Sequence, residues 1–429
     1  METTGRDHIE AVTRGHINSG KIDLFQQIGV NLIMGERSGC HVYDISGAKY
    51  LDVLCDGSTY NFGHRNPEIV DTLKAALDRV DIGCQFLASR ERALLAEDIV
   101  RTSPEGLSHV HFIASGSEAN DAAIKAARFA TGRRKIVSIA KSFHGVTGLA
   151  ANASDKAFWQ PFNAGRNADD FVTVAWNDLG QMADALAGDD VAAVLIETVP
   201  ATLGWPIPAD DYHAGVKVLC ERHGALLIMD EIQTGLGRSG HLWGLERWGA
   251  RPDIMVVAKG IGGGIYPFAY LAMTERAASW TREAPLAMPS TFGGSELGCV
   301  VARKVLALAS ADATLDHVRE MAALLGAGFD RLQARFPEQL LEVRQLGLAA
   351  GLKFTDPAGG VKMMRSLFRH GVLALFAGYD PSVVQLKPPL VITAVQIGQL
   401  LNALALAIAE MDEPLPFTQG MGALDTLHS

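Results

Sequence analysis

Seven short apolar runs constrain the fold of this chain more than any other feature of its sequence. Most of them end at a charged or polar residue, which is typical of strands buried on both faces of a sheet. Stretches of helical periodicity alternate with the runs, and this favours an α/β fold with a mainly parallel seven-stranded sheet. The runs are Val110–Ala114, Ile136–Ala140, Val172–Ala175, Val191–Ile196, Leu226–Met229, Ile254–Ala258 and Phe268–Met273.

The length of the chain and the change in its pattern of expected elements after about residue 310 predict two domains. Its 429 residues are enough for both. We expect a large domain over residues 61–310 and a smaller α+β domain built from both chain ends, residues 1–60 and 311–429. Residues 1–60 look irregular apart from short strands. The further elements expected are strands at His41–Asp44, Lys49–Val53, Leu348–Phe354, Val372–Phe376 and Val383–Leu386, and helices from Pro67 to Val80, from Arg90 to Arg101, over His317–Phe336 and from Thr393.

Composition argues against several classes of protein. The net charge is −10 and the longest basic cluster is Gly132–Lys135, so binding of nucleic acid is not expected. The five cysteines are scattered and form no Cys-x-x-Cys, and the N-terminus lacks a secretory signal, which favours a reduced, cytoplasmic protein without a metal site. The uncharged stretch Leu390–Ala409 is as long as a membrane span, but its polar stripe (Gln396, Gln399, Asn402) favours an amphipathic helix.

Two of the apolar runs end in an acid and in an amine. Asp230 follows Leu226–Met229, and Lys259 follows Ile254–Ala258. Ligands of open α/β sheets bind at the carboxyl ends of the strands, so we predict that both side chains face one crevice. A buried carboxylate needs a partner, which could be a cationic ligand nitrogen, a structural arginine or a helix cap. A desolvated lysine has a lowered pKa and becomes a nucleophile toward carbonyl groups.

Two further stretches follow strand ends. Gly116 and Ser117 open an alanine-rich helix, where backbone N–H groups form a cradle for an anion such as phosphate. Phe143 and His144 follow the next run, and an aromatic ring there could stack on a flat cofactor. Taken alone, a plain serine cap and a core phenylalanine are the simpler interpretations.

Together these features describe a single ligand, pyridoxal 5′-phosphate. Its aldehyde needs an amine such as that of Lys259, and its phosphate needs an anion cradle. The acid Asp230 would keep the pyridine nitrogen protonated, so that the ring accepts electrons from a carbanion. Gln233, three residues after Asp230, would face the same way if a turn begins there.

With these residues in view, the chain resembles the class III aminotransferases, pyridoxal-phosphate enzymes of fold type I, and is similar to the ornithine- and putrescine-type ω-aminotransferases. The resemblance extends from about Gly35 to Ala409. Its strongest motif is Leu226–Gly240, which is followed at the family's distance by Lys259.

The resemblance implies a role for each site residue. Lys259 would form the internal aldimine and then move the proton between the substrate and the cofactor. The other implied roles are pairing with the pyridine nitrogen for Asp230, proximity to the ring hydroxyl for Gln233, phosphate binding for Gly116 and Ser117, ring stacking for Phe143, support for His144, and proximity to the substrate for Glu197. Thr291 would reach the phosphate of the neighbouring subunit, which implies a homodimer with shared active sites.

One departure from the family concerns the substrate side. Members that hold an α-carboxylate commonly have Arg where Gln385 stands, and Gln makes no bidentate ionic contact. Lys387, two residues on, shares a strand face with Gln385. We therefore expect amino transfer between an amine or amino acid, with ω-amines, diamines and biosynthetic intermediates as candidates, and a keto acid or aldehyde. A racemase, aminomutase, decarboxylase or amine lyase would use the same cofactor chemistry, and a non-catalytic binding protein is the third alternative.

Overall fold

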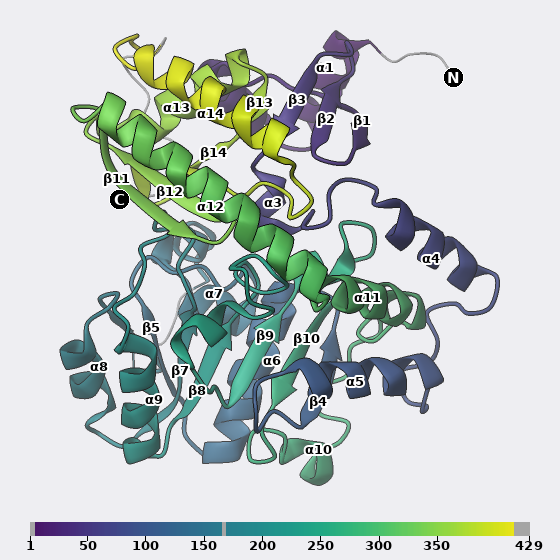
Figure 1. Ribbon diagram of the computed structural model, residues 1–429. Helices are drawn as coiled ribbons and strands as arrows, with labels where there is room; N and C mark the ends of the chain where they lie inside the picture. The colour runs from purple at the N-terminus through teal and green to yellow at the C-terminus, as the bar shows by residue number, and fades with distance from the viewer. Residues whose placement is uncertain (1–4, 165–168, 416–429) are drawn as a thin grey trace.

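The computed structural model describes residues 5–164 and 169–415, and its centre is a seven-stranded sheet (Figure 1). The strand order is β4-β10-β9-β8-β7-β5-β6. All seven predicted runs form these strands. Their bounds are β4 (His109–Ile113), β5 (Lys135–Ile139), β6 (Phe171–Val174), β7 (Val191–Glu197), β8 (Leu226–Asp230), β9 (Ile254–Val257) and β10 (Ala269–Met273).

The sheet is mainly parallel, as predicted, with one exception. The neighbouring pairs β5–β6, β5–β7, β7–β8 and β8–β9 are parallel. By contrast, β10 runs antiparallel to both β4 and β9. The connection from Val257 to Ala269 contains only a short 3-10 turn, whereas a parallel neighbour usually needs a crossover helix.

Helices cover both faces of this sheet. They are α4 (Pro67–Leu77), α5 (Arg90–Thr102), α6 (Gly116–Thr131), α7 (Gly148–Ala153), α8 (Leu179–Leu186), α9 (Tyr212–His223), α10 (Trp280–Glu283) and α11 (Glu296–Ala309). Successive side chains of a strand point to opposite faces. Leu226 and Ile228 of β8 accordingly share a core with alanines of α6, whereas Leu227 and Met229 share another core with residues of α9.

The two chain ends come together in a separate group of elements. The first sheet has the order β1-β2-β3-β13, and β13 pairs with β3 in parallel. The second sheet has the order β11-β12-β15-β14. Their bounds are β1 (Met34–Ser38), β2 (His41–Asp44), β3 (Lys49–Asp52), β11 (Leu340–Leu346), β12 (Ala349–Phe354), β13 (Val372–Leu373), β14 (Leu375–Ala377) and β15 (Asp380–Leu386). Figure 1 shows the purple N-terminal strands and the yellow C-terminal helix at the same end of the molecule.

Three longer helices and several short turns complete the chain. The helices are α12 (Asp312–Arg335), α13 (Gly359–Arg369) and α14 (Ala394–Ala409), and the last begins at Thr393 with the predicted capping box. None of the helices in the described part of the chain is both long and apolar enough to cross a bilayer. The short elements are α3 (Cys55–Ser58), η1 (Lys156–Phe158), η2 (Gln160–Phe162), η3 (Gly244–Trp248) and η4 (Lys259–Gly262).

The structure corrects two expectations about the chain ends. Residues 6–28 are not irregular, since they form the helices α1 (Arg6–His16) and α2 (Ser19–Ile28). The single strand expected at Val372–Phe376 is split at Ala374, because β13 pairs with β3 while β14 pairs with β15. The domain bounds remain predictions, and their ends at residues 1 and 429 lie outside the described residues.

Candidate active site

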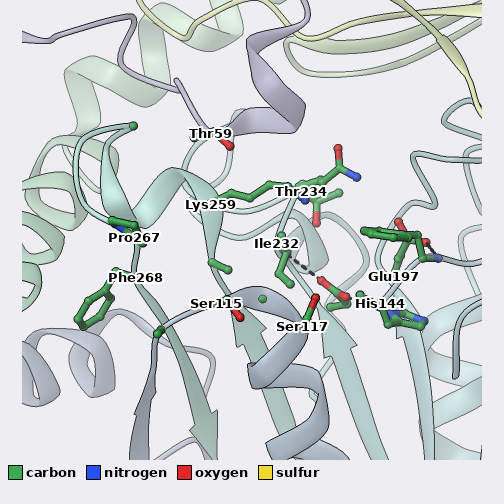
Figure 2. Close-up of a pocket in the computed structure, with 18 of the residues that line it drawn as sticks. Thr59, Ser115, Ser117, His144, Glu197, Ile232, Thr234, Lys259, Pro267 and Phe268 are labelled. Atoms are coloured by element: carbon green, nitrogen blue, oxygen red, sulfur yellow. Dashed lines mark hydrogen bonds and ion pairs between the residues drawn. The ribbon is translucent and has the colours of Figure 1, made fainter. Parts of the chain in front are cut away.

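A cavity of about 460 Å³ lies at the carboxyl ends of β7, β8 and β9. Figure 2 shows side chains from several strand ends and from the start of α6 converging on it. Eight of the nine predicted site residues line this cavity. They are Gly116, Ser117, Phe143, His144, Glu197, Asp230, Gln233 and Lys259.

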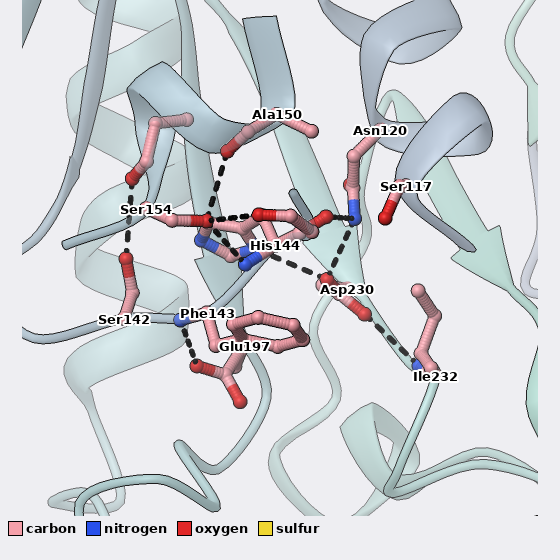
Figure 3. Close-up of polar contacts among 12 residues, drawn as sticks. Ser117, Asn120, Ser142, Phe143, His144, Ala150, Ser154, Glu197, Asp230 and Ile232 are labelled. Carbon is pink, nitrogen blue, oxygen red and sulfur yellow. Dashed lines mark hydrogen bonds and ion pairs between the residues drawn. The ribbon is translucent and has the colours of Figure 1, made fainter. Parts of the chain in front are cut away.

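Asp230 is held at the end of β8 by three hydrogen-bonding groups (Figure 3). Its Oδ1 accepts from the backbone N–H of Ile232 at 3.0 Å. Its Oδ2 lies 3.0 Å from His144 Nδ1 and accepts from Asn120 Nδ2, also at 3.0 Å. The carboxylate is buried, and these contacts stabilise its charge and fix its orientation.

Asn120 was missed by the sequence reasoning. Its side-chain amide also donates to the backbone carbonyl of His144 at 2.8 Å, so one residue of α6 holds both His144 and Asp230. The available signal was a polar residue on the sheet-facing side of a helix, among fully buried alanines such as Ala119 and Ala123.

Lys259 enters the cavity from the turn that follows β9. Its backbone has φ of 50°, a left-handed conformation that is strained for a lysine. Burial lowers the pKa of its ammonium group, and the opposing charges of Asp230 and Glu197 partly offset that effect. The α3 segment covers it closely, because a Cβ atom on Gly57 would lie 3.4 Å from Lys259 Cε and 3.3 Å from Gln233 Oε1.

The N-terminus of α6 forms the predicted anion cradle. Ser115 caps the helix by accepting from the N–H of Glu118. A Cβ atom on Gly116 would lie 2.9 Å from the side chain of Ile232, so only glycine lets the backbone approach the cavity this closely. Ser117 Oγ accepts from the N–H of Val146 at 3.2 Å and lines the cavity. A phosphate group fits the helix N-terminus because its N–H groups and dipole favour an anion.

A polar side chain and an aromatic one beside the cradle complete the fit to a flat, polar cofactor. Gln233 Oε1 is buried and has no hydrogen-bond partner among the described residues. Phe143 presents its ring to the cavity, and it contacts Phe158 with 4.7 Å between ring centroids. An aromatic face, a free amide oxygen, a carboxylate and an amine therefore surround one space that ends in an anion cradle.

Glu197 ends β7 directly beside Asp230 in the sheet. Its Oε1 accepts from the N–H of Phe143 and its Oε2 from the N–H of Ala201, each at 3.2 Å. Burial raises the pKa of this carboxyl to about 7; the charge of His144 lowers it and that of Asp230 raises it.

The remaining predicted residues lie away from the cavity of this chain. Thr291 is exposed, and its neighbour Ser290 donates to Glu118 Oε1 at 2.8 Å. Gln385 and Lys387 are buried and share a face, as predicted, since Lys387 Nζ donates to Gln385 Oε1 at 2.7 Å. Burial and the charge of Lys259 lower the pKa of Lys387 to about 7.

Comparison with known proteins identifies the class that this fold and site define. The family described as Aminotransferase class-III matches residues 26–408. This chain therefore belongs to the class III aminotransferases, and its cofactor is pyridoxal 5′-phosphate.

Two relatives are similar over most of their length. An uncharacterized aminotransferase of Archaeoglobus fulgidus is 40% identical over 409 residues, 94% of this chain and 95% of the relative. The putrescine aminotransferase of Pectobacterium atrosepticum is 33% identical over 387 residues, 87% of this chain and 81% of the relative.

Solved structures share the fold. A transaminase from the marine bacterium Virgibacillus superposes with a TM-score of 0.86 at 26% identity, covering 94% of this chain and 98% of that one. The taurine:2-oxoglutarate aminotransferase of Bifidobacterium kashiwanohense, in complex with PLP and glutamate, gives 0.84 at 25% identity, covering 97% of this chain and all 100% of the other. The chain is accordingly a PLP-dependent transaminase.

Proposed function

We propose that Lys259, Asp230 and Gln233 carry the transamination, which moves an amino group from an amine donor to a keto acid or aldehyde. Pyridoxal phosphate, when bound, supplies an aldehyde that captures amines and a ring that accepts the electrons of a carbanion. The observation that carries the proposal is the position of Lys259 and Asp230 in one cavity, beside the N-terminus of α6.

Each side chain has a role that follows from its surroundings. Lys259 is the nucleophile, because burial lowers the pKa of its ammonium and favours the free amine. The same amine then accepts and returns the proton that leaves the donor carbon. Asp230, oriented by Asn120 and His144, keeps a proton on the ring nitrogen. Gln233 binds the ring hydroxyl, Gly116 and Ser117 hold the phosphate, and Phe143 stacks on the ring.

The substrate side favours donors without a clamped α-carboxylate. The amide of Gln385 is fixed between the carbonyl of Phe376, to which its Nε2 donates, and the ammonium of Lys387. A neutral amide in this position gives no bidentate ionic contact to a carboxylate. An ω-amine, a diamine or a biosynthetic intermediate with a remote amino group fits this arrangement.

The active site is shared between two subunits. Thr291 and its neighbour Phe292 are exposed, so neither contributes to the cavity of its own chain. Arg92 donates to the carbonyls of Gly294 and Leu87, which brings a second exposed apolar segment beside the first. The exposed side chains of the two segments are Phe86, Leu87, Leu286 and Phe292. An apolar surface of this kind supports a homodimer in which Thr291 reaches the phosphate of the neighbouring subunit.

The compartment is the cytoplasm. The five cysteines, Cys40, Cys55, Cys84, Cys220 and Cys299, are all free thiols. Free thiols are typical of a reducing compartment.

Visible absorbance tests the chemistry. The purified protein with pyridoxal phosphate is titrated with single amines and amino acids, and the absorbance of the bound cofactor is followed. We expect one class of donor to convert the cofactor to its amine form, and a keto acid or aldehyde to restore it. Lys259→Ala is the control and should lose turnover by at least about 10³-fold. Product without conversion of the cofactor, or no transfer to any acceptor in a broad panel, would contradict the proposal.

Mixed dimers test the shared site. Lys259→Ala and Thr291→Ala chains are each inactive or impaired alone. When they are co-refolded, a mixed dimer holds one site with both Lys259 and Thr291 intact, so activity should return to about a quarter of the wild-type value. If Thr291 acted within its own chain, the mixture would show only the average of the two variants.

A further inference from the structure

Glu197 is a buried carboxylate that the proposed amino transfer does not use. It is 6% exposed, and its two hydrogen bonds come from the neutral backbone N–H groups of Phe143 and Ala201. A carboxylate offers about four acceptor sites, so about half remain open. No lysine, arginine or histidine of the described residues forms an ion pair with it.

The charges around Glu197 leave it without a cation of its own. Asp230 lies beside it on β8, and His144 is already turned toward Asp230. Lys259 is the only lysine or arginine among the described residues that line the cavity. Lys259 works at the reacting end of the donor, so the described lining offers Glu197 no second lysine or arginine for an ion pair of its own. A buried carboxylate without a counterion is costly.

The small sheet does not supply the missing cation. Gln385 on β15 is neutral, and the ammonium of Lys387 donates to the oxygen of that amide. Neither residue lines the cavity. The described lining of the cavity therefore offers the donor the carboxylate of Glu197 and no lysine or arginine from this sheet or from the residue that follows it.

We propose that Glu197 binds a second, non-reacting ammonium group of the donor, so that the preferred donors are α,ω-diamines. This inference rests on the proposed function. One end of the donor reacts at the cofactor, and the apolar chain lies against Val199, which lines the same cavity. The far ammonium has three N–H donors and enters the open acceptor sites of Glu197. Pairing with it keeps the carboxylate ionised in a buried position.

Three donors with four carbon atoms each distinguish ammonium binding by Glu197 from a purely structural role. 1,4-Diaminobutane, 1-aminobutane and 4-aminobutanoate share the reacting amine and differ only at the far end, which is cationic, neutral or anionic. With the complete enzyme, kcat/KM of the donor half-reaction should be highest for the diamine, by about tenfold over the monoamine. The same pairs with three to six carbons are compared, because the cavity selects the length. A diamine that nowhere exceeds its monoamine by more than about the twofold expected from two equivalent ends overturns the inference.

Two variants assign the preference to a residue. Glu197→Gln keeps an acceptor for Phe143 but removes the charge, and it should reduce the preference for diamine over monoamine to about the statistical twofold, mainly through KM. Lys387→Met is the control, because it removes a different buried charge that does not line the cavity. This variant should retain the preference for diamine over monoamine. A Glu197→Gln variant that lowers all three donors equally would show that Glu197 only orients Phe143. A loss of the preference in Lys387→Met would equally overturn the inference.

The failure of this inference and that of the proposed function are distinguishable. If no donor of any charge transfers its amino group in the wild-type enzyme, the proposed function fails. If monoamines or amino acids transfer normally and no diamine is preferred, only the role of Glu197 fails. Thermal unfolding of each variant confirms that it is folded before its donor preference is interpreted.

Discussion

The carboxylates on the two sides of the cavity differ in how fully they are paired. On the cofactor side, Asp230 receives three polar contacts, one of them from a side chain on α6. On the substrate side, Glu197 receives two contacts from backbone N–H groups and forms no ion pair with any described residue. The carboxylate of Asp230 is therefore fully paired within one chain, whereas that of Glu197 has no ion-pair partner among the described residues. This difference is the basis of our proposal that the charge of the donor is selected at Glu197.

Removing Asp230 gives the largest effect on the cofactor side. Asp230→Ala eliminates the carboxylate held by both Asn120 and His144. In the function that we propose, this is the group that keeps the ring nitrogen protonated. We expect kcat to fall by about 10²-fold or more for every donor, because the lost charge acts on the carbanion and not on the far end of the substrate. Steady-state rates with cationic, neutral and anionic donors measure this. A loss confined to one class of donor would contradict the division between the two sides.

The second prediction concerns Glu197 on the substrate side and the way in which the preference for diamine over monoamine changes with pH. Burial raises the pKa of Glu197 to about 7, so the carboxyl is neutral below that pH and ionised above it. Only the ionised form pairs with an ammonium group. The ratio of kcat/KM for a diamine to that for its monoamine should rise by about tenfold between about pH 6 and pH 8. The ratio cancels the titration of Lys259 and of the reacting amine, which affect both donors alike.

Glu197→Gln is the matched control for this profile. The amide does not titrate, so the ratio should be flat over the same range. A wild-type ratio that is flat, or one that falls as the pH rises, would be inconsistent with ammonium binding by an ionised Glu197.

Asn120 gives a smaller effect that falls on both stability and cofactor binding. Asn120→Ala removes the donor to Asp230 Oδ2 and leaves the buried carbonyl of His144 without this partner. We expect a loss of about 1–3 kcal/mol in the free energy of unfolding and a few-fold weaker binding of pyridoxal phosphate. Asn18→Ala, which removes the cap of α2 far from the cavity, is the control. It should cost about 1 kcal/mol and leave cofactor binding unchanged. If the two variants bound pyridoxal phosphate equally well, Asn120 would contribute to the stability of the fold but not to cofactor binding.

The sequence predicts the cofactor side better than the substrate side for a physical reason. The strands are visible because both of their faces are buried, and Asp230 and Lys259 stand out as charges that end apolar runs. Asn120 is harder to find because its contact joins residues 110 positions apart, and a single sequence does not show which helix face meets which strand. The same holds for Glu197, whose contact with the backbone of Phe143 joins residues 54 positions apart.

The ends of the chain and the direction of one strand escaped prediction for related reasons. α1 buries none of its residues and is predominantly polar, so its sequence has few of the apolar residues that mark a core-facing helix. The antiparallel direction of β10 depends on the short turn after Lys259, whereas its apolar composition is that of any buried strand. Patterns of hydrophobicity thus locate buried elements, but pairing and direction depend on connections and distant partners.

Gln385→Arg should produce the smallest change and addresses the substrate side directly. Gln385 is buried, and its amide oxygen receives the ammonium of Lys387, so an arginine there adds a cation close to an existing one. Gln385 does not line the cavity, so the new charge acts on the donor at a distance, opposing a donor ammonium and attracting a donor carboxylate. We expect the preference for 1,4-diaminobutane over 4-aminobutanoate to fall by about threefold, because the new charge acts at a distance and through a polarisable environment. Gln385→Met, which is neutral and of similar size, controls for the lost hydrogen bond and should leave the preference unchanged. Two results would contradict selection of donor charge by Glu197. One is an arginine variant with a higher preference for the diamine. The other is a methionine variant that lowers this preference as much as the arginine variant does.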